Sequence, residues 1–171
     1  MALKRHKNKL DNKIDAQKAN RIFSSGKNFA SKPNQEAVLR IIDANLNRCR
    51  EGLRVVEDSL RFVLNDGVSY KKIRAIRHKT DKILREIYGN IIKERNSFED
   101  SGRQMKENAK RDLAAIIAAN FKRAQESLRV LEEYSKSFLP EVSQEFKKQR
   151  YKAYIEEKAI YLKYKDFFVK K

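Results

Sequence analysis

Two segments of the chain carry the same polar side chains at the same spacing. Residues 44–58 and 119–133, which lie 75 positions apart, are identical at eight of fifteen positions. The shared groups that could do chemistry are an amide, a guanidinium and a carboxylate on successive turns: Asn45, Arg48 and Glu51 in the first segment, and Asn120, Arg123 and Glu126 in the second. Arginine can hold a phosphate through two parallel contacts, an amide can bind the polar edge of a ring, and a carboxylate can hold Mg²⁺ or accept a proton. The repeat therefore predicts a ligand-binding device.

The spacing of apolar residues predicts that each segment is a helix. In the first segment the apolar stripe is formed by positions three and four apart: Leu46, Cys49, Leu53, Val56 and Leu60. At about 100° per residue, Asn45 lies inside this stripe, Arg48 lies on its flank at roughly 300°, and Glu51 lies at its edge. A buried amide or guanidinium costs several kcal/mol unless its hydrogen bonds are satisfied, so a repeat of both at apolar positions needs an explanation.

Two explanations of the repeated polar residues are open. In the structural one, Asn45 and Asn120 bond each other or nearby carbonyls, and Arg48 pairs with Glu51 one turn away. In the functional one, the two helices form a pseudo-twofold pair with one shared cavity, since two copies are too few for a solenoid. Arg48 and Arg123 would then meet phosphate, and one of the asparagines would read a polar ring edge.

Other charged positions give weaker signals. Arg54 and Arg129 fall near 180° on their helices, where solvated ion pairs that contribute little are expected. Their acidic neighbours are Glu57, Asp58, Glu132 and Glu133. His78 is a candidate acid or base, although a single histidine on a helix is more often a packed or surface residue. The sequence has no Gly-x-x-x-x-Gly-Lys-Ser/Thr loop, no dinucleotide glycine fingerprint and no His-Glu-x-x-His helix.

The elements that must position these residues are predicted to be helices only. Five glycines, two prolines and long charged stretches are typical of an all-α fold. We expect an antiparallel helical bundle of about four long helices with an internal pseudo-twofold repeat. The predicted helices cover residues 37–64, 69 to about 91, 107–138 and 141–165. A proline stop at Pro33 precedes the first helix, and a turn at 65–67, a loop at 95–106 and Leu139-Pro140 separate the four helices.

Length and composition indicate one domain with a basic N-terminal arm. A chain of 171 residues with 40% hydrophobic content is long enough for one core. Residues 1–36 hold nine Lys or Arg against three acidic residues, which predicts a flexible arm that either solubilises the protein or touches RNA. Residues 37–171 are expected to form the helical bundle domain.

The cellular setting follows from features that are missing from the sequence. Cys49 is the single cysteine, which excludes an internal disulfide and a cysteine-based zinc site. No stretch approaches a membrane span, and the N-terminus lacks the apolar core of a signal peptide. We therefore expect a cytoplasmic protein with no membrane partner, as a monomer or a homodimer.

The formal net charge of +17 predicts a polyanionic partner. Nucleic acid, a membrane surface and phosphorylated metabolites all fit this charge, as does a lysine-rich solvated surface without a partner. The competing function class is a basic helical RNA-binding or adaptor protein without catalytic activity. It predicts a solvent-facing arginine stripe, whereas Arg48 and Arg123 are predicted to lie on the apolar side of their helices.

The segment from Arg40 to Asp58 resembles the helical hydroxymethylpyrimidine-phosphate kinase family of thiamin biosynthesis. It reads Arg40-Ile-Ile-Asp43-Ala-Asn45-Leu-Asn47-Arg48-x-x-Glu51-Gly52-Leu53-Arg54-Val55-Val56-Glu57-Asp58. Further matches are Arg77-His78, Arg95, Asp100, Gly102, the segment from Asn120 to Tyr134, and Arg150-Tyr151-x-x-Tyr154. The likeness covers about residues 37 to 162, and Asn96 stands where an acidic residue is expected.

This resemblance implies a reaction and a set of roles. The reaction is transfer of the ATP γ-phosphate to hydroxymethylpyrimidine phosphate, giving the diphosphate that thiamin-phosphate synthase consumes. ATP is the implied co-substrate and Mg²⁺ the implied metal. The catalytic candidates are Arg48, Arg123, Glu51 and Glu126, and the substrate-binding candidates are Asn45, Asn120, Arg95, Asp100 and His78. Arg95 joins the two repeated arginines in neutralising phosphate charge, and Asp100 is a third possible ligand for Mg²⁺.

Overall fold

The computed structural model describes residues 32–85, 88–96, 98, 112–137 and 139–169. These residues form helices and no strand, which confirms the all-α prediction for this part of the chain. The elements in order are α2 (Lys32–Asp58), the π-helix η1 (Ser59–Val63), α3 (Gly67–Ile83), α4 (Tyr88–Lys93), α5 (Leu113–Ser135), α6 (Pro140–Lys163) and α7 (Lys165–Phe168). Residues 1–31 of the predicted arm lie outside the described residues, and α2 begins within the last part of it.

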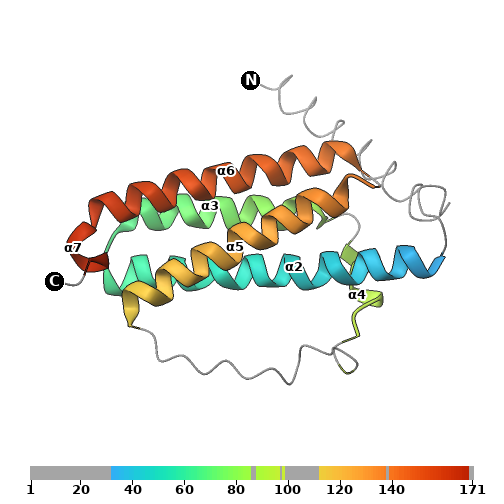
Figure 1. Cartoon of the computed structure of the whole chain (residues 1–171), viewed down its shortest axis with the longest axis horizontal. Helices are drawn as coiled ribbons and strands as arrows, with labels where there is room; N and C mark the ends of the chain where they lie inside the picture. The colour runs from blue at the N-terminus through green and yellow to red at the C-terminus, as the bar shows by residue number, and fades with distance from the viewer. Residues whose placement is uncertain (1–31, 86–87, 97, 99–111, 138, 170–171) are drawn as a thin grey trace, which may run out of the picture.

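The four long helices are arranged as two hairpins (Figure 1). Helices α2 and α6 run in one direction and α3 and α5 in the other. Each helix packs against two neighbours, because α2 contacts α3 and α5, and α6 contacts the same two. Apolar residues of all four helices fill the space between them, with Leu53, Ile73, Leu128 and Phe146 fully buried. Among the described residues, no helix is long and apolar enough to cross a membrane.

The second predicted helix is interrupted, contrary to the expectation of one helix from 69 to about 91. Helix α3 ends at Ile83, and α4 forms a separate short helix that packs on α2. Leu84 and Ile91 are both buried, so the apolar stripe reaches the core from either side of the break. Pro33 also differs from its predicted role as a stop, because α2 begins at Lys32 and includes this proline in its first turn, where a missing N–H is tolerated.

The turn after α2 ties the two hairpins together. Asp66 caps α3 by accepting hydrogen bonds from the Val68 and Ser69 amides at 3.1 and 3.0 Å. Its second oxygen accepts from the Ser69 hydroxyl at 2.7 Å and, from the end of α6, from Lys163 at 2.8 Å and the Tyr164 hydroxyl at 2.9 Å. Burial alone would raise the pKa of this carboxyl, but these donors hold the pKa well below its ordinary range.

Helices α2 and α5 approach each other closely at Gly52. A Cβ atom placed on Gly52 would lie 2.9 Å from the Asn120 carbonyl oxygen and 3.5 Å from the Ala124 Cβ. Cys49 and Ala124, which are equivalent in the repeat, are both small and fully buried, as expected where two helices cross. Burial raises the pKa of the Cys49 thiol to about 12, with the charge of Asp81 adding to the effect, so this thiol stays protonated.

Replacing Gly52 with alanine should destabilise the fold. Alanine gains about 1 kcal/mol of helix propensity, but its methyl group meets a backbone carbonyl that cannot rotate away, and overpacking of this kind costs about 1–3 kcal/mol. Gly89→Ala is the matched control, since a Cβ atom there meets nothing within 4 Å. Chemical denaturation should show a lower free energy of unfolding for Gly52→Ala and an unchanged or higher one for Gly89→Ala. Equal stability of the two variants would contradict the close approach.

Asp66→Asn should lower stability in a pH-dependent way. Because the folded pKa of Asp66 lies below its unfolded value of about 4, the carboxylate stabilises the fold above that pH, and this contribution is lost as the pH falls toward the folded pKa. The stability gap between the natural protein and the variant should therefore be widest near pH 7 and shrink below about pH 4. Thermal melts across this range test it, with Asp112→Asn at the exposed cap of α5 as the control. A stability difference that does not change with pH would show that the ionised Asp66 carboxylate is not the stabilising group.

Candidate functional site

The repeated asparagines and arginines lie around the crossing of α2 and α5. Helix α2 meets α5 at Gly52 and meets α3 at Glu57, which bonds Arg77. Helix α5 repeats this arrangement, with Ala124 toward α2 and Glu132 toward α6. At about 100° per residue, the repeated arginines must lie on the sides of α2 and α5 that point away from α3 and α6. We call the surface formed by Asn45, Arg48, Glu51, Asn120, Arg123 and Glu126 the outer face.

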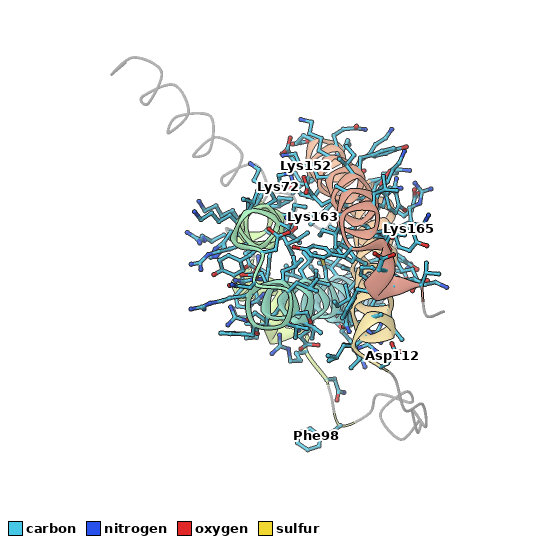
Figure 2. The ribbon with its side chains drawn as sticks, turned by 90° about the vertical axis from the view of Figure 1, so that its left-hand side faces the viewer. Lys72, Phe98, Asp112, Lys152, Lys163 and Lys165 are labelled. Carbon is cyan, nitrogen blue, oxygen red and sulfur yellow. The ribbon has the colours of Figure 1, made fainter. Side chains whose placement is uncertain are left out.

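Figure 2 looks along the helices and separates the side of α2 and α5 from the side of α3 and α6. Phe98 and Asp112 lie beside α2 and α5, whereas Lys72 and Lys152 lie on the opposite side, with α3 and α6. That opposite side is bridged between helices by ion pairs, for example Lys72 to Glu156 at 3.2 Å. The outer face thus differs from it in having repeated polar residues around a close helix crossing.

Both asparagines are anchored to their own helices. Asn45 donates a hydrogen bond from Nδ2 to the Ile41 carbonyl at 2.9 Å, and Asn120 does the same to the Ile116 carbonyl at 2.8 Å. Asn45 is 8% exposed and Asn120 is half-buried. Neither side chain makes another hydrogen bond to a residue in the described ranges. The alternative in which the asparagines bond nearby carbonyls is thus confirmed, and the amide oxygen and second N–H of each make no hydrogen bond to a described residue.

Arg48 and Glu51 are exposed, so the prediction that Arg48 lies on the apolar side of α2 is wrong. The buried arc of α2 ends at Asn45 and Gly52, because α5 covers the helix only up to that line. The predicted bridge between Arg48 and Glu51 is not formed, and neither side chain pairs with any residue that the structure describes. Both charges are available at the surface of the outer face.

The second copy is exposed in the same way. Arg123 and Glu126 are both solvent-exposed. Lys122 approaches Glu126 to 3.9 Å, but both side chains are largely in solvent, so this pair contributes little. The structure therefore brings the asparagine, arginine and glutamate of each repeat to the same surface.

Arg95 occupies a different side of α2. It makes a bidentate contact with Asp43, from Nε to Oδ2 at 2.7 Å and from Nη2 to Oδ1 at 2.6 Å. This contact raises the pKa of the Arg95 guanidinium above its ordinary value, with Tyr88 adding to the effect, and it neutralises its charge. Asp43 and Arg48 point in directions about 140° apart on the helix, so Arg95 does not join the outer face. Asp100 lies outside the described residues.

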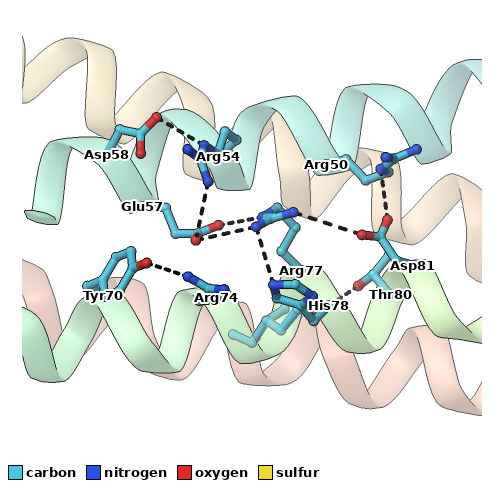
Figure 3. A network of polar contacts seen from close by, with 11 residues as sticks. Arg50, Arg54, Glu57, Asp58, Tyr70, Arg74, Arg77, His78, Thr80 and Asp81 are labelled. Atoms are coloured by element: carbon cyan, nitrogen blue, oxygen red, sulfur yellow. Dashed lines mark hydrogen bonds and ion pairs between the residues drawn. The ribbon is translucent and has the colours of Figure 1, made fainter.

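A buried ion pair joins α2 to α3 (Figure 3). Glu57 is fully buried and accepts hydrogen bonds from Nε and Nη2 of Arg77, a contact that raises the pKa of Arg77 above its ordinary value. Arg54, which pairs with Asp58 at 3.1 Å, completes the cluster. The prediction of a solvated position thus holds for Arg54, whereas Asp58 is half-buried. The prediction is wrong for Glu57, since a charged residue this deeply buried needs a partner from another helix.

The same ion pair is repeated between α5 and α6. Glu132, at the position equivalent to Glu57, accepts hydrogen bonds from Nε and Nη2 of Arg150 at 2.9 and 2.8 Å. Arg129 contacts the same carboxylate at 3.1 Å and Glu133 at 2.6 Å. The sequence did contain a signal for this pair: both repeats carry a glutamate, Glu57 and Glu132, at the same position on the buried side of the helix. The repeat therefore includes one internal Glu–Arg lock in each hairpin.

His78 belongs to the first of these locks and not to the outer face. It is exposed on α3, with Nε2 3.5 Å from Nη2 of Arg77. The Glu57 position that Arg77 contacts lies nine residues beyond Arg48, or about 14 Å along α2. The structure thus gives His78 no position from which to act on a ligand between Arg48 and Arg123.

The described residues contain no group of three or more histidine, cysteine or acidic side chains that could hold a metal ion. Mg²⁺ in phosphate-transferring sites usually takes one or two carboxylates, with substrate phosphates and water as its other ligands. Glu51 on the outer face makes no ion pair within the described ranges and is one such carboxylate. The outer face therefore fits a metal ion carried by a phosphate ligand, and does not fit a resident metal held by protein alone.

Comparison with known proteins adds independent information. Residues 40–159 match the model of the ThiD2 family. Thiamine-phosphate synthase of Nostoc sp. is 37% identical over 123 residues, covering 70% of this chain and 34% of that protein. The thiamine-phosphate synthases of Thermosynechococcus vestitus and Rhodopirellula baltica are each 37% identical, over 138 and 130 residues, covering 79% and 74% of this chain and 38% and 35% of theirs. This chain thus spans about a third of these relatives, and no solved structure matches it.

Breaking one Glu–Arg lock should be more harmful than replacing it entirely. Arg77→Met leaves the fully buried Glu57 carboxylate without its partner and should lower the free energy of unfolding by about 3–5 kcal/mol. The double variant Arg77→Met/Glu57→Leu should recover most of that loss, because an apolar pair of similar size carries no desolvation penalty. Arg74→Met, one turn away and bonded to the Tyr70 hydroxyl, is the control. A double variant no more stable than the single one, measured by urea denaturation, would contradict this account.

Proposed function

This chain belongs to the ThiD2 family, and we propose on that basis that it is a phosphotransferase of thiamin biosynthesis. The proposed reaction moves the γ-phosphate of ATP to hydroxymethylpyrimidine phosphate and yields its diphosphate. The relatives support the pathway, because the similar proteins described above are named thiamine-phosphate synthases. The kinase step rests on the resemblance of the repeated motif and on the chemistry of the outer face.

One observation carries the proposal: Arg48 presents an exposed guanidinium that no described residue neutralises, and the repeat places Arg123, which is also exposed, at the equivalent position on α5. Two other arginines of α2 are paired: Arg50 contacts Asp81 at 2.8 Å, and Arg54 contacts Asp58. Two arginines around one pseudo-twofold position suit a ligand with several phosphate oxygens.

The reaction asks for positioning and charge neutralisation, which the outer face can supply. An oxygen of the pyrimidine's phosphate forms a bond to the γ-phosphorus, the bond from that phosphorus to the bridging oxygen breaks, and ADP leaves with the electron pair. The attacking oxygen is already ionised near neutral pH, since the second pKa of a phosphate monoester is about 6. The step therefore needs no general base, which favours Glu51 and Glu126 as metal ligands over proton acceptors.

Mg²⁺, when bound with the nucleotide, would neutralise the negative charge that builds up on the transferring group. In this chain Glu51 and Glu126 are the outer-face carboxylates that would hold it. Arg48 and Arg123 would bind the phosphates, and the anchored amides of Asn45 and Asn120 would orient the rings. Arg95 and His78 take no part in this scheme, because they lie in other contacts.

RNA binding is the second candidate function, and one observation favours it. The sequence argued against RNA because the repeated arginines were expected on the apolar side of their helices, but Arg48 and Arg123 are exposed. With the net charge of +17, an exposed arginine pair also suits a phosphate backbone. The family match is what makes a phosphorylated pyrimidine the better proposal.

Purified protein with ATP and Mg²⁺ should convert hydroxymethylpyrimidine phosphate to the diphosphate, and Arg48→Ala or Arg123→Ala should slow this about a hundredfold or more. Loss of one charge-neutralising group costs about 3–4 kcal/mol of barrier, while an exposed side chain contributes little to folding. Arg61→Ala, in η1 beyond the end of α2, where the side chain stacks on Phe62, is the control and should keep full activity. Turnover and melting temperature are measured on the same samples.

The result against the proposal is no diphosphate from the natural protein under conditions in which a control kinase works. In that case, RNA binding that weakens in both arginine variants and falls steeply with salt would support the second candidate.

A further inference from the structure

The two repeated asparagines lie on either side of the repeated arginines. The carbonyl of Asn120 packs against Gly52, which is seven residues beyond Asn45, or about 10 Å along α2. Arg48 lies between Asn45 and Gly52 in the sequence, and α5 runs antiparallel to α2, so the repeat places Arg123 in the equivalent interval on α5 (Figure 1). The outer face thus has two ends, each with an asparagine, and a centre with two arginines.

Each asparagine amide is held in a fixed orientation. Nδ2 of Asn45 donates to the Ile41 carbonyl at 2.9 Å, and Nδ2 of Asn120 donates to the Ile116 carbonyl at 2.8 Å. Turning either amide by 180° would place its oxygen against that carbonyl oxygen and would bring two acceptors together without a proton. Each side chain therefore presents the same ordered pair to a ligand: an oxygen that accepts and one N–H that donates.

Both substrates of the proposed reaction carry the complement of this pair. Hydroxymethylpyrimidine and adenine each have an exocyclic amino group next to an unprotonated ring nitrogen. On the edge that carries the ring nitrogen N1 of adenine, the amino group donates to an amide oxygen while the ring nitrogen accepts from the amide N–H. Asparagine makes a two-bond contact of the same kind to the amino group and N7 of adenine in nucleic acids. Two asparagines with the same orientation would therefore suit two substrates that each carry this amino and ring-nitrogen edge.

We infer, on the basis of the proposed function, that the two asparagines divide the two substrates between them: one binds the aminopyrimidine edge of hydroxymethylpyrimidine phosphate and the other binds the equivalent edge of the adenine ring of ATP. The phosphates of both substrates then extend toward Arg48 and Arg123 at the centre. The nucleotide site is thus a copy of the pyrimidine site, and it needs no glycine-rich loop.

The first test is the discrimination between amino and oxo rings by the natural protein. Inosine triphosphate differs from ATP in an oxygen at the place of the amino group and a proton on the adjacent ring nitrogen, so both of its bonding groups are reversed. We expect kcat/KM for ATP to exceed that for inosine triphosphate by about tenfold or more. The same preference is expected for hydroxymethylpyrimidine phosphate over its oxo analogue.

The second test assigns the asparagines. Asn45→Ala and Asn120→Ala should each raise KM by about tenfold or more for one substrate only, and for different substrates. Each variant should also lose the amino-over-oxo preference for the substrate whose KM it raises, an effect that a purely structural asparagine would not produce. Asn47→Ala is the matched control, because Asn47 lies on the same helix but contacts Asp43 at 3.4 Å on another side. Melting temperatures confirm that the variants fold.

Equal use of ATP and inosine triphosphate by the natural protein would overturn the inference even if the alanine variants fail to fold. KM changes for the same substrate in both variants would overturn it as well, while leaving the kinase activity itself intact. If the natural protein makes no diphosphate at all, the proposed function fails first. Calorimetry with ATP and with hydroxymethylpyrimidine phosphate, each alone, then decides: binding that each asparagine variant weakens for a different ligand supports the inference, and any other pattern refutes it.

Discussion

The close approach of α2 and α5 is the constraint on which the other features depend. The Asn120 carbonyl lies where a side chain on Gly52 would otherwise be, so the two helices cross with only small groups between them. Residues on the inner side of the crossing, such as Leu53 and Leu128, are driven into the core. Residues just beyond the crossing on the other side stay in solvent. The contact that closes the core is therefore also the one that exposes the repeated arginines.

Local patterns predicted α2, α3 and α5 because each of these helices has its own apolar stripe. The break between α3 and α4 could not be predicted in this way. Leu84 and Ile91 reach the core whether the helix is continuous or not, so the stripe is the same in both cases. What decides is the packing of α4 on α2, a contact between segments far apart in the sequence. The widening of the last turn of α2 into η1 likewise leaves the pattern of apolar residues unchanged.

The sequence identified residues of the candidate site, but it did not predict their solvent exposure or their ion-pair partners. A helical wheel gives the direction of Arg48 relative to the stripe, but the edge of the buried region depends on how far α5 reaches over α2. The prediction that Glu57 lies in solvent was wrong for a different reason. Its nearest basic residue in sequence is Arg54, yet its main partner Arg77 comes from another helix. Spacing rules describe neighbours within one helix, and they contain no information about such pairs.

The internal repeat is not perfect, and one departure distinguishes the two halves of the molecule. Asp43, which anchors Arg95, has exposed Ala118 as its equivalent on α5, so only one half carries this carboxylate and its arginine. A surface with perfect twofold symmetry would bind a ligand equally well in two opposite orientations. Here a Glu–Arg lock occurs in each hairpin, whereas the Asp43 carboxylate occurs on α2 and not at the equivalent position of α5. The two halves of the molecule are therefore not equivalent, although each carries the same asparagine, arginine and glutamate on the outer face.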